Sequence, residues 1–98
     1  ELGLTDKCFN TGTGMPADNA ALLKSGTIKS LTLWDPAIAG QAMISLAVMV
    51  LNGETIEGPV DLGVEGYNAM EFRAGSSTVL EGQGWITIDA ENVDSFGF

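Results

Sequence analysis

The sequence predicts an α/β fold in which a parallel sheet with flanking helices is followed by a β-rich tail. Three observations lead to this prediction. Strand-like and helix-like segments alternate as β-α-β-α over residues 8–51. Residues 36–51 form a long apolar helical stretch, and the segments after residue 53 are short and bounded by glycines. Alternation of this kind is typical of parallel strands connected by helices that cover the sheet.

Length and charge limit the kinds of protein this can be. The chain has 98 residues, with 13 acidic and 4 basic side chains and a formal net charge of −9. This length is sufficient for one small domain. Because phosphate binding needs clustered lysine and arginine, and the four basic residues are scattered, nucleic acid is not expected as a partner.

The side-chain inventory also excludes several kinds of chemistry. The chain has no histidine and one cysteine, so it lacks the residues for soft-ligand metal sites and for Ser-His or Cys-His catalysis. The acidic residues after residue 54 are scattered among turns, which predicts a solvated surface instead of paired carboxylates for acid–base catalysis. The residues therefore offer no candidate for these reactions, and we expect no metal and no cofactor.

The first half of the chain reads as strand, helix and strand. Residues 8–11 predict a short buried strand, and the glycine-rich residues 11–14 predict a turn. Pro16 suits the first turn of a helix over residues 17–24. Gly26 is suited to end that helix in the left-handed conformation.

The second strand and helix are the clearest elements. Residues 27–34 alternate and are rich in β-branched side chains, which predicts a strand. Asp35 can cap a following helix, and Pro36 fits its first position. The helix over residues 36–51 is apolar nearly all round, so it needs cover on more than one side. Since the chain offers little to cover it, we expect these 98 residues to be the C-terminal end of a larger protein.

The tail predicts short strands. Residues 59–64 and 67–73 are two strand candidates, and residues 78–81 and 85–88 are expected to form a hairpin. A last helical turn is expected over residues 90–95, capped by the aspartate that precedes it.

Two junctions between a strand and a helix carry polar or aromatic residues that could bind a ligand. Trp34 lies beside Asp35, and an indole next to a carboxylate suits a polyol, because the ring stacks on C–H faces while the carboxylate accepts hydroxyl hydrogen bonds. A core tryptophan followed by a helix cap explains the same pair without a ligand. Residues 11–14 precede a helix but lack phosphate-loop spacing. They are either a tight turn or a ligand-binding strand end. Trp85 is expected to pack within the hairpin.

The order of these motifs resembles a known family. Residues 12–54 run from Gly-x-Pro through a helix, SGTIK, a strand and LWDP into the apolar helix. Residues 79–98 (VLEGQGWITIDAENVDSFGF) pass from a short strand to Glu-Asn-Val-Asp-x-Phe-x-Phe. In this order the chain resembles the C-terminal part of type I periplasmic sugar-binding proteins of ABC transporters. The most similar branch binds rhamnose or the quorum signal autoinducer-2.

The resemblance implies the C-terminal portion of a periplasmic-binding-protein type I fold, in which two α/β lobes enclose the ligand. Residues 1–35 would be part of the C-terminal lobe. Residues 36–59 would contain the helix that packs on the N-terminal lobe, a lobe that this chain lacks. Residues 60–98 would form a crossover strand and the β-rich tail.

The resemblance also implies a function. The chain would belong to the solute-binding subunit of an ABC importer, in the periplasm, peripheral to the membrane, with an ABC permease as partner. A sugar or sugar-like ligand would contact Thr13, Trp34 and Asp35. Thr13 matches the position at which ribose-binding relatives have an aspartate. The resemblance thus implies a binding protein that is not an enzyme. Two alternatives stay open: the effector-binding domain of a sugar-responsive transcription regulator, and a self-contained module, either a small acidic enzyme or a structural or interaction module.

Overall fold

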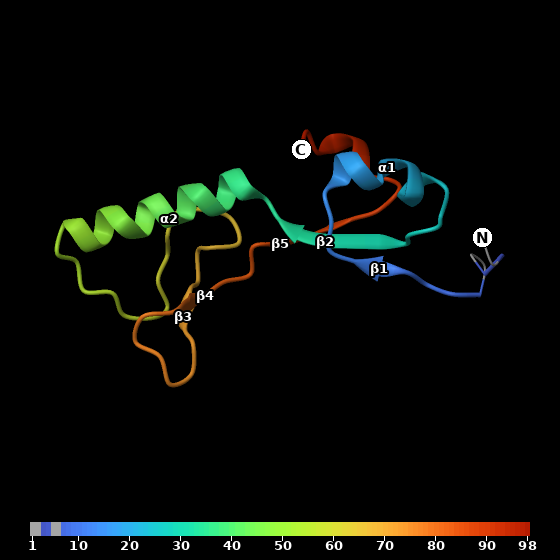
Figure 1. Cartoon of the computed structure of the whole chain (residues 1–98). Helices are drawn as coiled ribbons and strands as arrows, with labels where there is room; N and C mark the ends of the chain where they lie inside the picture. The colour runs from blue at the N-terminus through green and yellow to red at the C-terminus, as the bar shows by residue number, and fades with distance from the viewer. Residues whose placement is uncertain (1–2, 5–6) are drawn as a thin grey trace. The chain divides into compact units, whose positions relative to one another are not determined.

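The computed structural model describes residues 3–4 and 7–98, so the expectations for residues 1–2 and 5–6 lie outside the described part. The fold is α/β, with a small mixed sheet, a two-stranded sheet and two α-helices in the described residues (Figure 1). The coarse prediction of fold class is therefore confirmed. The elements are β1 (Thr11–Gly12), α1 (Pro16–Lys24), β2 (Ser30–Trp34), α2 (Pro36–Leu51), β3 (Glu71–Phe72), β4 (Leu80–Glu81), β5 (Trp85–Ile88) and the 3-10 helix η1 (Val93–Ser95).

The chain divides into two compact units. Unit 1 comprises Glu1–Leu33 and Ile86–Phe98, and unit 2 comprises Trp34–Trp85. The chain thus leaves unit 1 at the end of β2 and returns to it at the start of β5. Residues 60–85, expected to begin with a crossover strand, all belong to unit 2.

The sheet of unit 1 has the strand order β1-β2-β5, with β1 and β2 parallel as predicted. Thr11 pairs with Ser30 and Gly12 with Leu31. The prediction of a buried strand at residues 8–11 is wrong, because residues 8–10 are exposed and lie outside the strand. The physical reason is that β1 is an edge strand, which has a neighbour on one side only.

Helix α1 begins and ends where the sequence predicts. Pro16 occupies its first turn, and Gly26 follows its C-terminal cap with a φ of 74°. The predicted strand at residues 27–34 starts later, at Ser30. The intervening residues belong to the turn, since the Ile28 amide donates to the Leu22 carbonyl at 3.1 Å.

The core of unit 1 follows from the alternation of β2. Its residues Leu31 and Leu33 are buried, whereas Thr32 and Trp34 are exposed. The two leucines pack in one apolar cluster with Leu23 of α1 and Ile88 of β5, and Val93 of η1 completes it. One face of the sheet is therefore covered by α1 and by the C-terminal residues.

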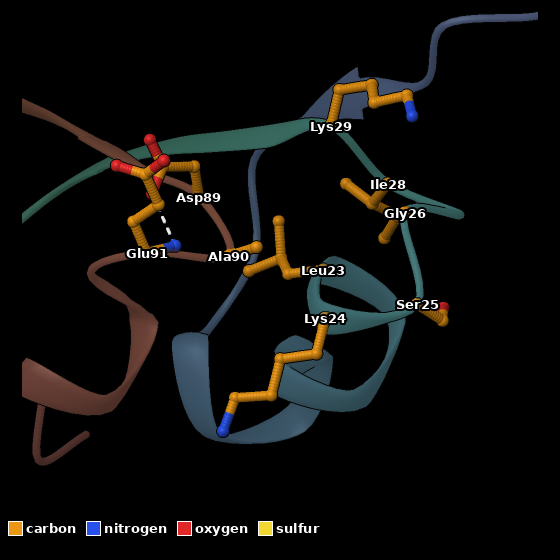
Figure 2. A pocket seen from close by; sticks show the side chains of 9 residues that line it. All are labelled: Leu23, Lys24, Ser25, Gly26, Ile28, Lys29, Asp89, Ala90 and Glu91. Carbon is orange, nitrogen blue, oxygen red and sulfur yellow. Dashed lines mark hydrogen bonds between the residues drawn. The ribbon is translucent and has the colours of Figure 1, made fainter.

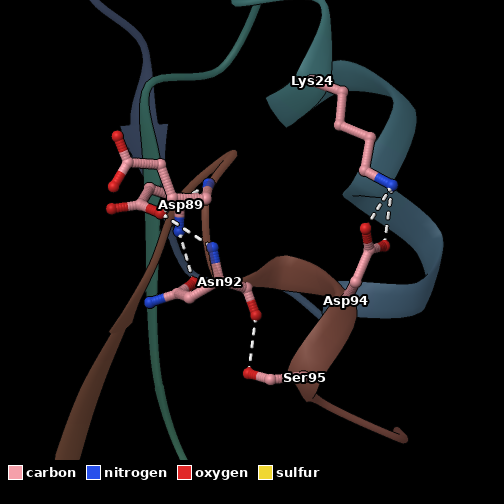
Figure 3. A network of polar contacts seen from close by, with 6 residues as sticks. Lys24, Asp89, Asn92, Asp94 and Ser95 are labelled. Carbon is pink, nitrogen blue, oxygen red and sulfur yellow. Dashed lines mark hydrogen bonds and ion pairs between the residues drawn. The ribbon is translucent and has the colours of Figure 1, made fainter.

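Capping interactions order the C-terminal turn of unit 1 (Figure 3). The Asp89 carboxylate accepts hydrogen bonds from the amides of Glu91 and Asn92 at 2.9 and 3.2 Å, so it caps the turn that follows it. The helix is shorter than the predicted 90–95, because residues 90–92 form a turn and the N-cap residue of the helix is Asn92, without a side-chain cap. The turn closes as the 3-10 helix η1. The Lys24 ammonium donates to both oxygens of Asp94 at 2.7 Å. Because both side chains are exposed, this ion pair contributes little to stability.

Unit 2 begins with α2, whose predicted limits are confirmed. Pro36 is its first residue, and Gly53, with a φ of 75°, follows its C-terminal cap. One side of α2 packs on the loop that follows it: Ala42 shares a buried cluster with Val60, Leu62 and Met70.

Several predicted strands of the tail are shorter than expected or pair differently. Residues 59–64 form one isolated bridge, between Val60 and Met70, and β3 covers only Glu71–Phe72 of the candidate at 67–73. The predicted hairpin of residues 78–81 with 85–88 is wrong. Strand β4 pairs antiparallel with β3, and β5 joins the sheet of unit 1.

The glycine-rich segment 82–84 explains why that hairpin does not form. The Gln83 amide donates to the Gly66 carbonyl at 2.8 Å, which holds the segment against the 65–67 turn. A Cβ on Gly84 would collide with the Tyr67 ring, and one on Gly82 with the Met70 side chain. The glycines therefore let the segment pass close over these side chains, and the chain does not turn back on itself.

Candidate functional site

The two tryptophans of the chain lie next to each other in unit 2. Trp34 is the last residue of β2 and Trp85 the first of β5, and these strands are neighbours in the sheet. Their ring centroids are 5.5 Å apart with an interplanar angle of 83°, an edge-to-face arrangement. Trp34 is 49% exposed and Trp85 is 58% exposed. Trp34 is therefore not the core tryptophan of the alternative interpretation.

An open apolar pocket lies beside Trp34. Its volume is about 350 Å³, within the range of small-molecule sites. Trp34 and Tyr67 supply its aromatic walls, and aliphatic side chains supply the rest. The aliphatic lining residues are Ala39, Ala42, Met43, Leu46, Leu62, Met70 and Leu80. Such a surface accepts apolar atoms and offers few polar groups, so hydrogen bonds to a polyol would have to come from its edge.

Asp35 directly follows Trp34 in the sequence and is not one of the residues that line the pocket. One of its carboxylate oxygens, Oδ1, accepts hydrogen bonds from the amides of Ala37 and Ile38 at 2.8 and 3.2 Å. The predicted helix cap is thus confirmed. In the part of the chain that the structure describes, the second oxygen accepts no hydrogen bond. The side chain can therefore cap α2 and still offer an acceptor to a hydroxyl.

Replacing Asp35 separates these two roles. We expect Asp35→Ala to lower the free energy of unfolding by about 1 kcal/mol, since it removes the acceptor for two helix amides. Asp35→Asn keeps a capping oxygen and should stay within about 0.5 kcal/mol of the unchanged protein, because Asn and Asp cap equally well. Urea denaturation of both variants measures this. Equal losses in the two variants would contradict the capping role.

Thr13, the third predicted ligand residue, belongs to unit 1. It is exposed and lies in the short connection between β1 and α1. The following turn is tight, because a Cβ on Gly14 would stand 3.0 Å from the Asn19 side-chain nitrogen. This fits the prediction of a close strand-to-helix turn. Of the three predicted ligand residues, Trp34 and Asp35 are consecutive residues of unit 2, whereas Thr13 belongs to unit 1.

A second pocket, of about 360 Å³, lies in unit 1 at the C-terminal end of α1 (Figure 2). Its charged lining residues are Lys24, Lys29, Asp89 and Glu91, so opposite charges balance. Figure 2 shows the two lysine side chains at opposite sides of the pocket. Lys24 is paired with Asp94, and the Asp89 carboxylate accepts backbone amides. Groups already engaged in this way are poorly suited to hold a ligand.

Sequence reasoning missed the exposure of Trp85 because it placed this residue in a hairpin. The alternation of β5 carries the missed signal. Ile86 and Ile88 pack in the core of unit 1, so Trp85 and Thr87 must face the other way. The same reasoning applied to β2 places Trp34 opposite Leu33. Alternation thus predicts two outward-facing indoles at the ends of neighbouring strands.

Comparison with known proteins adds no assignment. No protein-family model matches the chain, and no curated protein sequence matches it either. The described residues include no group of three or more metal-binding side chains placed to hold an ion. None of the helices described is long and apolar enough to cross a bilayer.

Proposed function

We propose that this chain is the C-terminal part of the solute-binding subunit of an ABC importer, with the type I periplasmic-binding-protein fold. Its ligand would be a sugar or a sugar-like molecule held between two lobes. The proposal joins the motif resemblance over residues 12–54 and 79–98 with the α/β fold and the exposed Trp34 beside Asp35.

The observation that carries the proposal is the uncovered apolar face of α2. Among its exposed side chains, Ile44 is 68% exposed and Leu51 is 85% exposed. No charged residue occurs in the sixteen residues of this helix. Soluble monomers rarely expose a continuous apolar surface of this kind. A second lobe packed on α2 would cover it. The same face argues against a self-contained module.

The proposed mechanism is binding without chemistry. The Trp34 ring would stack on the C–H face of the ligand, and Asp35 would accept a hydroxyl hydrogen bond. Thr13 is the third ligand contact that the resemblance implies. A ligand that touches both lobes binds the closed form more tightly than the open one, so it shifts the population toward closure. The closed form would then dock on the permease, in the periplasm and at the membrane surface.

Isothermal titration calorimetry of the full-length polypeptide that contains this chain tests the proposal. We expect saturable heat with at least one member of a panel of pentoses, deoxyhexoses and autoinducer-2. Glutamate, an amino acid that lacks a sugar ring, serves as the control and should give no binding heat. Absence of heat with every sugar would refute the proposal, as would equal binding of glutamate.

A further inference from the structure

We propose that Trp85 is a second ligand-contacting residue, which forms with Trp34 an aromatic corner for the ring of a cyclic polyol. This inference rests on the proposed function and extends it, because the resemblance supplies Trp34 and Asp35 but gives no role to Trp85. Nothing in the strand pairing requires an indole at this position, since the core of unit 1 is filled from the opposite face of β5 by Ile86 and Ile88.

The geometry of the two rings leaves them available. In an edge-to-face pair the edge of one ring covers one face of the other, whereas a stacked pair covers a face of each. With an interplanar angle of 83°, the contact between the two indoles therefore covers one face of one ring only. This agrees with the exposure of both indoles to about half their surface. Two ring planes at nearly a right angle offer a ligand two aromatic surfaces, one for the face of its ring and one for the rim.

The chemistry at the corner selects the class of ligand. Indole faces attract C–H groups, and the neighbouring Asp35 carboxylate offers an acceptor for hydroxyl groups. In the described part of unit 2 the one basic side chain, Arg73, is paired with Glu81 at 2.6 Å. An inorganic anion would therefore find no cation at the corner. A ring with an apolar face and a hydroxyl edge, as in a pyranose or furanose, matches these groups.

The test compares substitutions that differ in ring character. Trp85→Phe keeps an aromatic face, whereas Trp85→Leu keeps apolar volume without one. With the sugar that binds the full-length polypeptide, we expect Trp85→Leu to weaken affinity about five- to ten-fold and Trp85→Phe to stay within about two-fold. Phe9→Ala, which truncates an exposed aromatic residue of unit 1, is the control and should bind unchanged. Melting temperatures of all three variants are compared with that of the unchanged protein.

A second measurement needs no folded Leu variant. The unchanged polypeptide is labelled with 5-fluorotryptophan, and the ¹⁹F resonances of the two residues are assigned from Trp34→Phe and Trp85→Phe. A saturating amount of sugar should shift both resonances. If only the Trp34 resonance shifts, or if Trp85→Leu binds as tightly as Trp85→Phe, the role of Trp85 is refuted while the proposed function stands. If the unchanged protein binds no sugar, both the role of Trp85 and the proposed function are refuted.

Discussion

Truncation of Ile88 to alanine should cost about 3 kcal/mol of unfolding free energy, within the 2–5 kcal/mol found for large-to-small changes in protein cores. Ile88 is fully buried at the end of β5 and lies in the cluster that joins β2, α1 and η1. Its removal takes away apolar contacts and leaves a cavity between elements from both ends of the sequence. The loss is measured by urea denaturation followed by far-UV circular dichroism.

Ile44→Ala is the matched control, because the same side chain is removed from the exposed face of α2. In the 98-residue chain it should change the unfolding free energy by no more than about 0.5 kcal/mol. Alanine also has the higher helix propensity, which offsets the small loss of contact. Equal destabilisation by the two substitutions would show that the face of α2 is covered in solution.

Gly66→Ala should be about as damaging as the core truncation, for a different reason. Gly66 has a φ of 79°, where a Cβ costs about 1–2 kcal/mol. A Cβ there would also stand 2.8 Å from the Gly84 Cα, which is backbone and cannot rotate away. Crowding of this kind typically adds about 1–3 kcal/mol. The total expected loss is therefore about 2–5 kcal/mol, measured by thermal and urea unfolding.

Comparison with Gly75→Ala separates the crowding contribution from the backbone contribution. Gly75 has the same φ of 79°, but nothing lies within 4 Å of the position of its Cβ. Its substitution should therefore lower the unfolding free energy only by the cost of the positive φ. The losses of unfolding free energy in the two variants should differ by about 1–3 kcal/mol. If the two variants unfold alike, the close approach of residues 66 and 84 does not exist in solution.

The elements that could be predicted from the sequence are those with local causes. Pro36 and Asp35 define the start of α2 through a fixed φ and a capping carboxylate, and Gly53 ends it through a positive φ. These signals need no knowledge of distant residues. The same holds for α1, which lies between Pro16 and Gly26.

The tail could not be predicted in the same way, because its pairing is decided by residues far apart in the sequence. Strands of two residues carry almost no pattern of their own. Strand β5 pairs with β2 because of the apolar face of β2 and because segment 82–84 passes close over Tyr67. Without knowledge of this contact, a glycine-rich connection between two strands predicts a tight hairpin turn.

For the candidate site, sequence reasoning found one half of the aromatic pair. The local pattern LWDP, which ends a strand and begins a helix, points to Trp34. The predicted hairpin gives β5 the wrong partner strand and therefore predicts that Trp85 packs inside it. The pairing of β2 with β5 brings the two indoles together, and this is a tertiary property.

The division of the chain has a consequence for the order of folding. Unit 2 is a single continuous segment, whereas unit 1 is assembled from Glu1–Leu33 and Ile86–Phe98. Bringing these two pieces together closes a loop that contains all of unit 2, at an entropic cost on the order of 3–4 kcal/mol for a flexible chain. If unit 2 folds first, the loop is shortened before it closes. During synthesis, the core around Leu23 and Leu31 must therefore wait for residues 86–98 to leave the ribosome.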